Sequence, residues 1–217
     1  MKLDRIKKLK SLILSGVLSF SILLTGCSTV VQETNISSSS TNNNSNTNIE
    51  ISNQIPTDFV KATIERVVDG DTIKLKLSDS NEIITLRLLL VDTPESVKKG
   101  VDPQPYSIEA SNYAKETLKQ GDTVYIEYDE GDKTDKYDRH LGYLWFYPNN
   151  SNELKMFNEE LIEKGYARVG YVYSQRKHLD ILNKAQEKAK SQELNIWSVP
   201  GYVTNKGYDV KAYNNNK

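Results

Sequence analysis

Two stretches of alternating apolar and polar residues, joined by a short acidic turn, constrain this chain more than any other feature. Lys61 to Val68 and Thr72 to Leu77 both alternate, and Asp69-Gly70-Asp71 lies between them. A period of two places one face of a strand in the core and the other in solvent. A glycine between two aspartates is typical of the turn between paired strands. The pattern therefore predicts a hairpin with two carboxylates at its tip.

The rest of the chain predicts three more strands and three helices. Ile83 to Val91 is a third strand, and its last four residues are apolar enough to be buried on both faces. Two more strands, Val124 to Tyr128 and Leu141 to Tyr147, flank a polar loop. A first helix is expected from Ser107, its N-cap, to Gln120, and a second from Asn158 to Lys164. A third helix is indicated by the apolar face of Leu179, Leu182, Ala185 and Ala189. This order favours an α+β fold, mainly β, built on a five-stranded barrel of the OB type with three helices.

Composition divides the chain into four parts. Residues 1–26 are expected to be a lipoprotein signal peptide, and residues 27–56 a disordered Ser/Asn-rich tether. The folded domain is placed at 57–198, and 199–217 is expected to be a flexible tail because it is rich in Asn and Lys.

The signal peptide interpretation rests on charge and length. Five basic residues precede an apolar run from Leu12 to Leu24, which is shorter than a membrane span. The next residues are Leu24-Thr25-Gly26-Cys27, and Cys27 is the only cysteine in the chain. This sequence resembles a bacterial lipobox, which implies lipidation of Cys27 and anchoring at the outer face of the cell membrane. An uncleaved anchor helix with an incidental cysteine is the alternative.

Carboxylates at strand ends are the first candidate chemical group. Asp69 and Asp71 lie at the predicted turn, and Asp92 and Glu95 follow the third strand in Val91-Asp92-Thr93-Pro94-Glu95. Adjacent strand ends would bring these oxygens together around a Ca²⁺ or Mg²⁺ ion. Each motif alone is equally consistent with an ordinary turn or loop cap.

Basic residues are the second candidate group, although the net charge is only −1. Arg87 lies within an apolar strand and needs an anionic partner, either a protein carboxylate or a phosphate. Residues 164–178 contain no acid and interleave lysines and arginines with Tyr171 and Tyr173, among others. Such a stretch suits a groove that binds phosphates and stacks bases; a strand with half-buried tyrosines is the alternative.

Five ordered motifs resemble the thermonuclease (staphylococcal nuclease) family. They are V-V-D-G-D-T at 67–72, L-R-L-L-L-V-D-T-P-E at 86–95, T-D-K-Y-D-R at 134–139, Y-V-Y at 171–173 and L-N-I-W at 194–197. The resemblance spans about residues 60–197 and implies a Ca²⁺-dependent nuclease on an OB-fold barrel, which hydrolyses DNA and RNA to 3′-phosphate products.

The resemblance also implies a role for each matched residue. Asp71, Asp92 and the Thr93 carbonyl would be calcium ligands, with Asp69 next to them. Glu95 matches the proposed general base, and Arg87 and Arg139 match the arginines that bind the reacting phosphate. Lys136 and Tyr137 match residues that contact the other nucleotide phosphate, and Tyr171 and Tyr173 match tyrosines of the nucleotide pocket.

One departure from the family pattern is Asp138, which stands where a glycine is usual. Aspartate tolerates left-handed backbone geometry, so the turn is expected to survive, while its charge could weaken phosphate binding at Arg139. The sequence thus predicts a monomeric, exported, lipid-anchored nuclease that acts on DNA and RNA and prefers single strands. Two alternatives are a non-catalytic module that binds single strands at the cell surface and a surface lipoprotein with a structural calcium.

Overall fold

The acidic hairpin predicted from the sequence begins the folded domain. The computed structural model describes residues 55–96, 100, 102–149 and 151–216. Strands β1 (Val60–Asp69) and β2 (Thr72–Leu77) pair antiparallel, and Asp69 opposite Thr72 is the last pair before the turn. Gly70 and Asp71 therefore form the turn at the tip of the hairpin, directly after Asp69 at the end of β1.

Three further strands close the sheet into a barrel. β3 (Ile83–Leu88) pairs antiparallel with β2 and in parallel with β6 (His140–Phe146), while β5 (Thr123–Glu127) joins β1 to β6. The short strand β7 (Lys155–Met156) extends the sheet beyond β6. Inward-facing aliphatic side chains from the barrel strands are fully buried, as alternation requires. The predicted α+β class and five-stranded closed barrel are confirmed.

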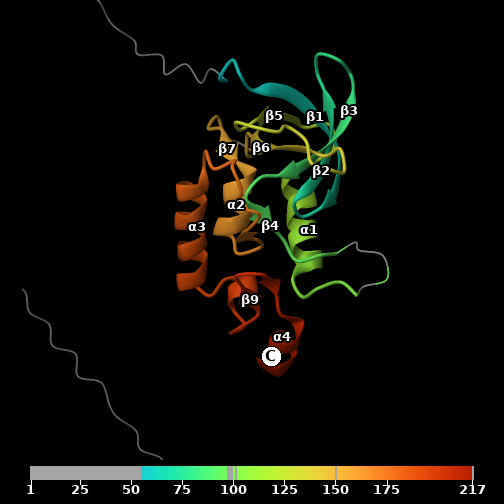
Figure 1. Cartoon of the computed structure of the whole chain (residues 1–217). Helices are drawn as coiled ribbons and strands as arrows, with labels where there is room; N and C mark the ends of the chain where they lie inside the picture. The colour runs from blue at the N-terminus through green and yellow to red at the C-terminus, as the bar shows by residue number, and fades with distance from the viewer. Residues whose placement is uncertain (1–54, 97–99, 101, 150, 217) are drawn as a thin grey trace, which may run out of the picture. The chain divides into compact units, whose positions relative to one another are not determined.

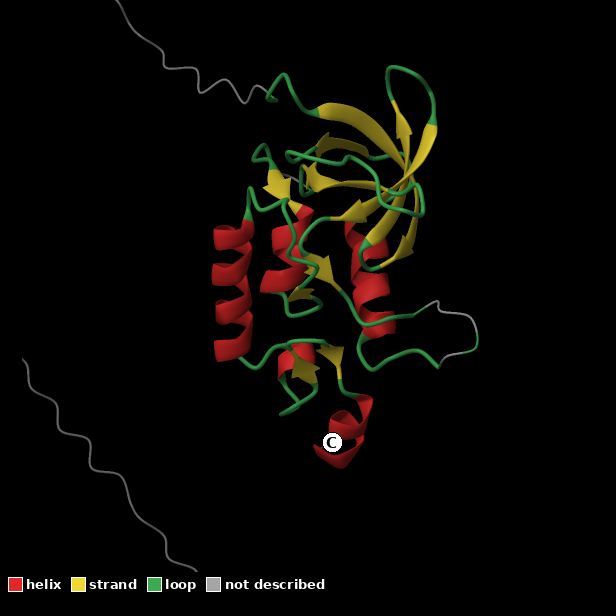
Figure 2. Cartoon of the chain, in the orientation of Figure 1, coloured by secondary structure: helices red, strands yellow, loops and turns green. Residues whose placement is uncertain are grey.

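Three helices lie on one side of the barrel in Figures 1 and 2: α1 (Ser107–Thr117), α2 (Phe157–Glu163) and α3 (Leu179–Ser191). The predicted apolar face of α3 is buried at Leu182, Ala185 and Ala189. The predicted N-cap of α1 is wrong, because Tyr106 occupies that position in a left-handed conformation and Ser107 is the first, fully buried helical residue.

The third strand is shorter than predicted. It ends at Leu88, and Leu90 has a φ of 60°, which turns the chain out of the strand. Val91–Asp92 then forms a separate strand, β4, paired with β8 (Arg168–Val169). The apolar run is buried as expected, but it crosses from the barrel to a second small sheet and carries Asp92 with it.

Residues 199–216, which the sequence analysis expected to be a flexible tail, contain regular secondary structure. A 3₁₀ helix, η1 (Asn195–Trp197), leads to the hairpin β9 (Val203–Thr204) and β10 (Gly207–Tyr208), and then to α4 (Val210–Asn216). Ile196, Val199 and Tyr202 form a second small apolar core. Aromatic residues stabilise this segment, which composition alone did not reveal.

The signal peptide, the tether and Cys27 lie outside the described residues. Within the part that is described, no helix is long and apolar enough to cross a membrane.

Candidate active site

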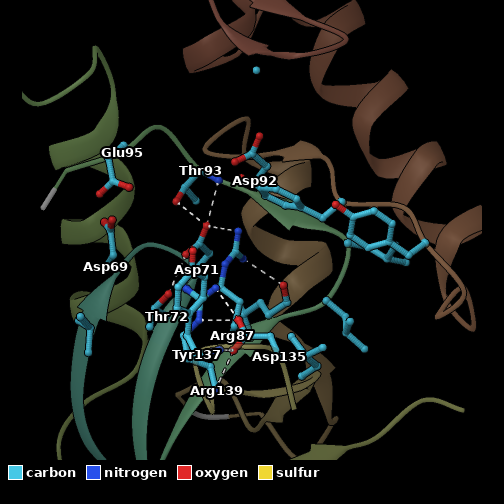
Figure 3. A pocket seen from close by; sticks show the side chains of 18 of the residues that line it. Asp69, Asp71, Thr72, Arg87, Asp92, Thr93, Glu95, Asp135, Tyr137 and Arg139 are labelled. Atoms are coloured by element: carbon cyan, nitrogen blue, oxygen red, sulfur yellow. Dashed lines mark hydrogen bonds and ion pairs between the residues drawn. The ribbon is translucent and has the colours of Figure 1, made fainter. Parts of the chain in front are cut away.

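One pocket of about 980 Å³ gathers the side chains that the sequence singled out. It opens where the β1–β2 turn, the β3–β4 segment, the loop before β6 and the segment after β8 meet (Figure 3). Its lining includes every predicted catalytic, metal-binding and substrate-binding residue: Asp71, Arg87, Asp92, Thr93, Glu95, Lys136, Tyr137, Arg139, Tyr171 and Tyr173. Asp69 lines it as well.

The acidic turn docks directly on the segment that follows β4. Asp71 Oδ2 accepts hydrogen bonds from the Thr93 hydroxyl at 3.1 Å and the Thr93 amide at 3.3 Å. A Cβ at Gly70 would come within 2.9 Å of the Thr93 Cγ2 atom. Glycine is therefore required at the centre of the turn, because any side chain would push the two segments apart.

Arg87 links the barrel to this junction. Its Nη2 atom lies 3.0 Å from Asp71 Oδ2, and Nη1 donates to the carbonyls of Leu88 at 3.1 Å and Val91 at 2.9 Å. The guanidinium also lies 5.2 Å from the ring centroid of Tyr171. The sequence left open whether Arg87 meets a carboxylate or a phosphate. The structure gives it a carboxylate partner and also places it in the pocket wall.

Asp92 is held by a cation that sequence reasoning did not assign to the site. Arg168 Nη2 lies 2.7 Å from Asp92 Oδ2, and both side chains are largely buried. Burial raises the pKa of Asp92, and the charge of Asp71 acts in the same direction, against the lowering effect of Arg168 and Arg87. A Cβ at Gly170 would lie 2.6 Å from the Asp92 Cβ, so glycine permits this close approach.

Asp69 and Glu95 lie to one side of Arg87 in Figure 3. Asp69 Oδ1 accepts hydrogen bonds from the Ser96 hydroxyl at 2.6 Å and the Gly70 amide at 2.8 Å. Burial raises the pKa of Asp69 despite these bonds. Glu95 is positioned through its backbone, because its amide donates to Gln104 Oε1 at 2.8 Å and its carbonyl accepts from the Gln104 amide.

Arg139 is held by Asp135 rather than by the adjacent Asp138. Its Nε and Nη2 atoms lie 2.8 and 2.6 Å from Asp135 Oδ2. These bonds and those from the backbone outweigh partial burial and lower the pKa of Asp135. Asp138 adopts a φ of 60°, so the prediction that aspartate supports the left-handed turn is confirmed.

Exposed tyrosines frame the opening of the pocket. Tyr137, Tyr171 and Tyr173 are 68%, 55% and 67% exposed. Residues 171–173 lie beyond the end of β8, so they are not part of a strand as the alternative required. The basic stretch itself contributes less free charge than predicted, because Arg168 pairs with Asp92 and Lys177 pairs with Glu127. The exposed parts of the tyrosine rings can stack with bases.

The oxygen donors suit a hard divalent cation. Asp71 and Thr93 are in contact, and the charge of Asp71 raises the pKa of Asp92, so a cation near both would relieve that repulsion. Within the described residues no three His, Cys, Asp or Glu side chains are grouped to hold a metal. Asp71 and Asp92 nevertheless supply the oxygen donors that such a cation takes.

The comparison with known proteins matches the region that contains most of these residues. The family described as staphylococcal nuclease homologue matches residues 85–199, which is more than half of the chain. The chain belongs to the staphylococcal nuclease family. This assignment agrees with the closed barrel.

Three relatives illustrate the similarity. The chain is 41% identical to endonuclease YncB of Bacillus subtilis (strain 168) over 152 residues, covering 70% of this chain and 68% of that protein. It is 40% identical to the SPbeta prophage-derived endonuclease YokF of the same organism over 153 residues, covering 70% of this chain and 49%, about half, of the relative. It is 39% identical to the thermonuclease of Staphylococcus intermedius over 134 residues, covering 62% of this chain and 74% of the relative.

Sequence reasoning gave no site role to Arg168, which pairs with Asp92. It also gave none to three residues of the pocket lining, which are Asp135, Lys206 and Tyr208. Arg168 belongs to the acid-free stretch, and its position beside the Y-V-Y motif was a usable signal. Asp135 lies within the T-D-K-Y-D-R motif but received no role. Lys206 and Tyr208 come from the C-terminal segment, which no sequence pattern connected to the pocket.

Proposed function

We propose that this protein is an endonuclease that hydrolyses phosphodiester bonds of DNA and RNA. The observation that carries the proposal is the convergence of Arg87, Arg139 and Glu95 on one pocket framed by exposed tyrosines. Relatives named endonuclease and thermonuclease support it.

The two arginines would bind the phosphate and stabilise the negative charge that grows in the transition state. Arg87 is preorganised for this role, since Asp71 and two backbone carbonyls fix its guanidinium. Arg139 is held by Asp135, so an incoming phosphate competes with that carboxylate. Glu95 is the candidate general base that takes the proton from the attacking water. The proposed hydrolysis leaves products that end in a 3′-phosphate.

The remaining residues would position the substrate. Tyr171 and Tyr173 offer exposed ring faces to the bases of a single strand. Lys136 and Tyr137 lie together at the edge of the pocket, where they would contact a neighbouring phosphate. Calcium is the proposed cofactor, held by Asp71, Asp92 and the Thr93 carbonyl. When bound, the ion supplies Lewis acid polarisation of the phosphate.

A cleavage assay tests this function. The purified protein is incubated with single- and double-stranded DNA and with RNA, in Ca²⁺ or in excess EGTA. Cleavage of nucleic acid in Ca²⁺ and its loss in EGTA are expected. Binding of single strands without cleavage would support the non-catalytic alternative, and cleavage that persists without a divalent metal would refute the calcium requirement.

We also propose that the mature protein is a lipoprotein on the outer face of the bacterial membrane. The support is the basic and apolar leader followed by Leu24-Thr25-Gly26-Cys27. Cells that express the wild type or Cys27→Ala are labelled with a radioactive fatty acid. Label is expected on the wild type alone. Label retained by the variant would refute lipidation at Cys27.

A further inference from the structure

The C-terminal hairpin closes part of the pocket, although it lies beyond the segment that matches the family. Tyr202 is fully buried, and its hydroxyl donates to the Pro105 carbonyl at 2.6 Å. Its ring lies 5.3 Å from that of Tyr208 and 5.2 Å from that of Tyr213. These contacts make the hairpin an integral part of the domain and fix its position relative to the loop that precedes α1.

Tyr208 fastens the hairpin to the strand that carries Asp92. Its hydroxyl donates to the Asp92 carbonyl at 2.5 Å, and burial raises its pKa well above the ordinary value. The position of the β9–β10 turn is thereby coupled to the backbone of β4.

Lys206 occupies the turn of this hairpin and lines the same pocket as Arg87 and Arg139. Its backbone amide donates to the Thr204 hydroxyl at 3.1 Å, which shapes the turn. Arg87, Arg139 and Arg168 each have a carboxylate within ion-pair distance. Among the described residues no carboxylate forms an ion pair with the exposed Lys206, so its charge is available to an anion.

We propose that Lys206 binds a backbone phosphate of the nucleic acid next to the scissile one, and that Tyr208 is the positioning residue that holds it there. The inference rests on the proposed nuclease function. The hairpin then adds a binding contact to the substrate site from a segment outside the family match. It supplies affinity, and it takes no part in the chemistry.

The test compares Lys206→Ala with Lys211→Ala, an exposed lysine of α4 that does not line the pocket. Binding of a short fluorescein-labelled oligothymidylate is measured by fluorescence anisotropy in EGTA between about 50 and 200 mM NaCl. Loss of one phosphate contact on a single strand should reduce the slope of log K against log salt by about 0.7. Cleavage assays in Ca²⁺ should show a several-fold higher KM with kcat unchanged.

Two further variants separate positioning from general stability. Lys206→Arg should keep the wild-type slope, because it keeps the charge. Tyr208→Phe removes only the hydroxyl and should raise KM and reduce the salt slope at a temperature where its circular dichroism matches the wild type. An unchanged slope and KM in Lys206→Ala would overturn the phosphate contact, and unchanged values in Tyr208→Phe would overturn the positioning role. If the wild type neither binds nor cuts nucleic acid, the proposed function fails and this inference fails with it.

Discussion

Arg87→Lys tests whether the pocket depends on the shape of a guanidinium or only on a positive charge. Arg87 makes one ion pair and donates two hydrogen bonds to backbone carbonyls. A lysine ammonium is a single point and cannot reach all three oxygens in the same geometry. Loss of two charge-assisted hydrogen bonds of about 1.5–3 kcal/mol each, partly offset by solvation, should destabilise the fold by about 2–4 kcal/mol.

The same substitution should also slow catalysis, by a free energy of similar size. Removing one hydrogen-bond donor to the transition state raises the activation free energy by about 2.7–4 kcal/mol, which corresponds to a roughly 10²–10³-fold lower kcat. Both quantities are measured on one preparation, kcat by cleavage of DNA well below the melting temperature and stability by thermal unfolding.

The matched control is Arg66→Lys, at an exposed position on β1. It should leave both kcat and the melting temperature at wild-type values. If Arg87→Lys keeps kcat within tenfold of the wild type, the guanidinium is not the group that stabilises the transition state and the reasoning is refuted.

Four further outcomes are expected. Glu95→Gln should lower kcat about 10²-fold or more without changing the melting temperature, and normal turnover would place the base elsewhere. Gly170→Ala should destabilise the fold by about 1–3 kcal/mol, because its Cβ would lie 2.6 Å from that of Asp92; an unchanged melting temperature would contradict that contact. Asp138→Gly should lower the KM for DNA, because it removes a negative charge next to Arg139. Asp138→Ala should destabilise the fold by about 1 kcal/mol, because alanine tolerates the left-handed φ of 60° less well. Equal unfolding curves for Asp138→Ala and the wild type would contradict that strain. Glu127→Gln should destabilise the fold by about 2–4 kcal/mol at neutral pH, and the difference should shrink as pH falls below the ordinary pKa of 4.5 in acid unfolding.

The sign of the Glu127 prediction follows from its contacts. The carboxylate is buried, which alone raises its pKa, but hydrogen bonds from Lys177, His178 and Trp145 outweigh burial and lower it. Such a group stabilises the fold above its unfolded pKa, and the contribution is lost as pH falls through the folded value. Exposed Glu116 on α1 provides the control, since Glu116→Gln should leave the acid unfolding curve unchanged.

Alternation and family motifs predicted the barrel and the residues of the pocket because both are encoded locally. The two-residue period of β1 and β2 can be read without information from elsewhere in the chain. The break at Leu90 could not be read this way, because an apolar run looks the same whether it continues a strand or crosses to another sheet.

The partners of the site residues were also beyond the sequence. Arg168 and Asp92 are brought together by the pairing of β4 with β8, and no local pattern specifies that register. The C-terminal segment has a polar composition typical of disorder, yet a few tyrosines at suitable positions are enough to fold it onto the domain. Composition averages over such positions and hides them.

During folding, the pocket can form only after β3 has paired in parallel with β6. Arg87 lies on β3 opposite Leu141, two residues beyond Arg139, so this pairing brings the two arginines to the same pocket. A chain in which the barrel is still open has the two halves of the phosphate site apart and should be inactive. Recovery of cleavage during refolding should therefore follow the closure of the barrel, a long-range event that is slow compared with helix formation. The recovery of nuclease activity would thus report when β3 pairs with β6 and the barrel closes.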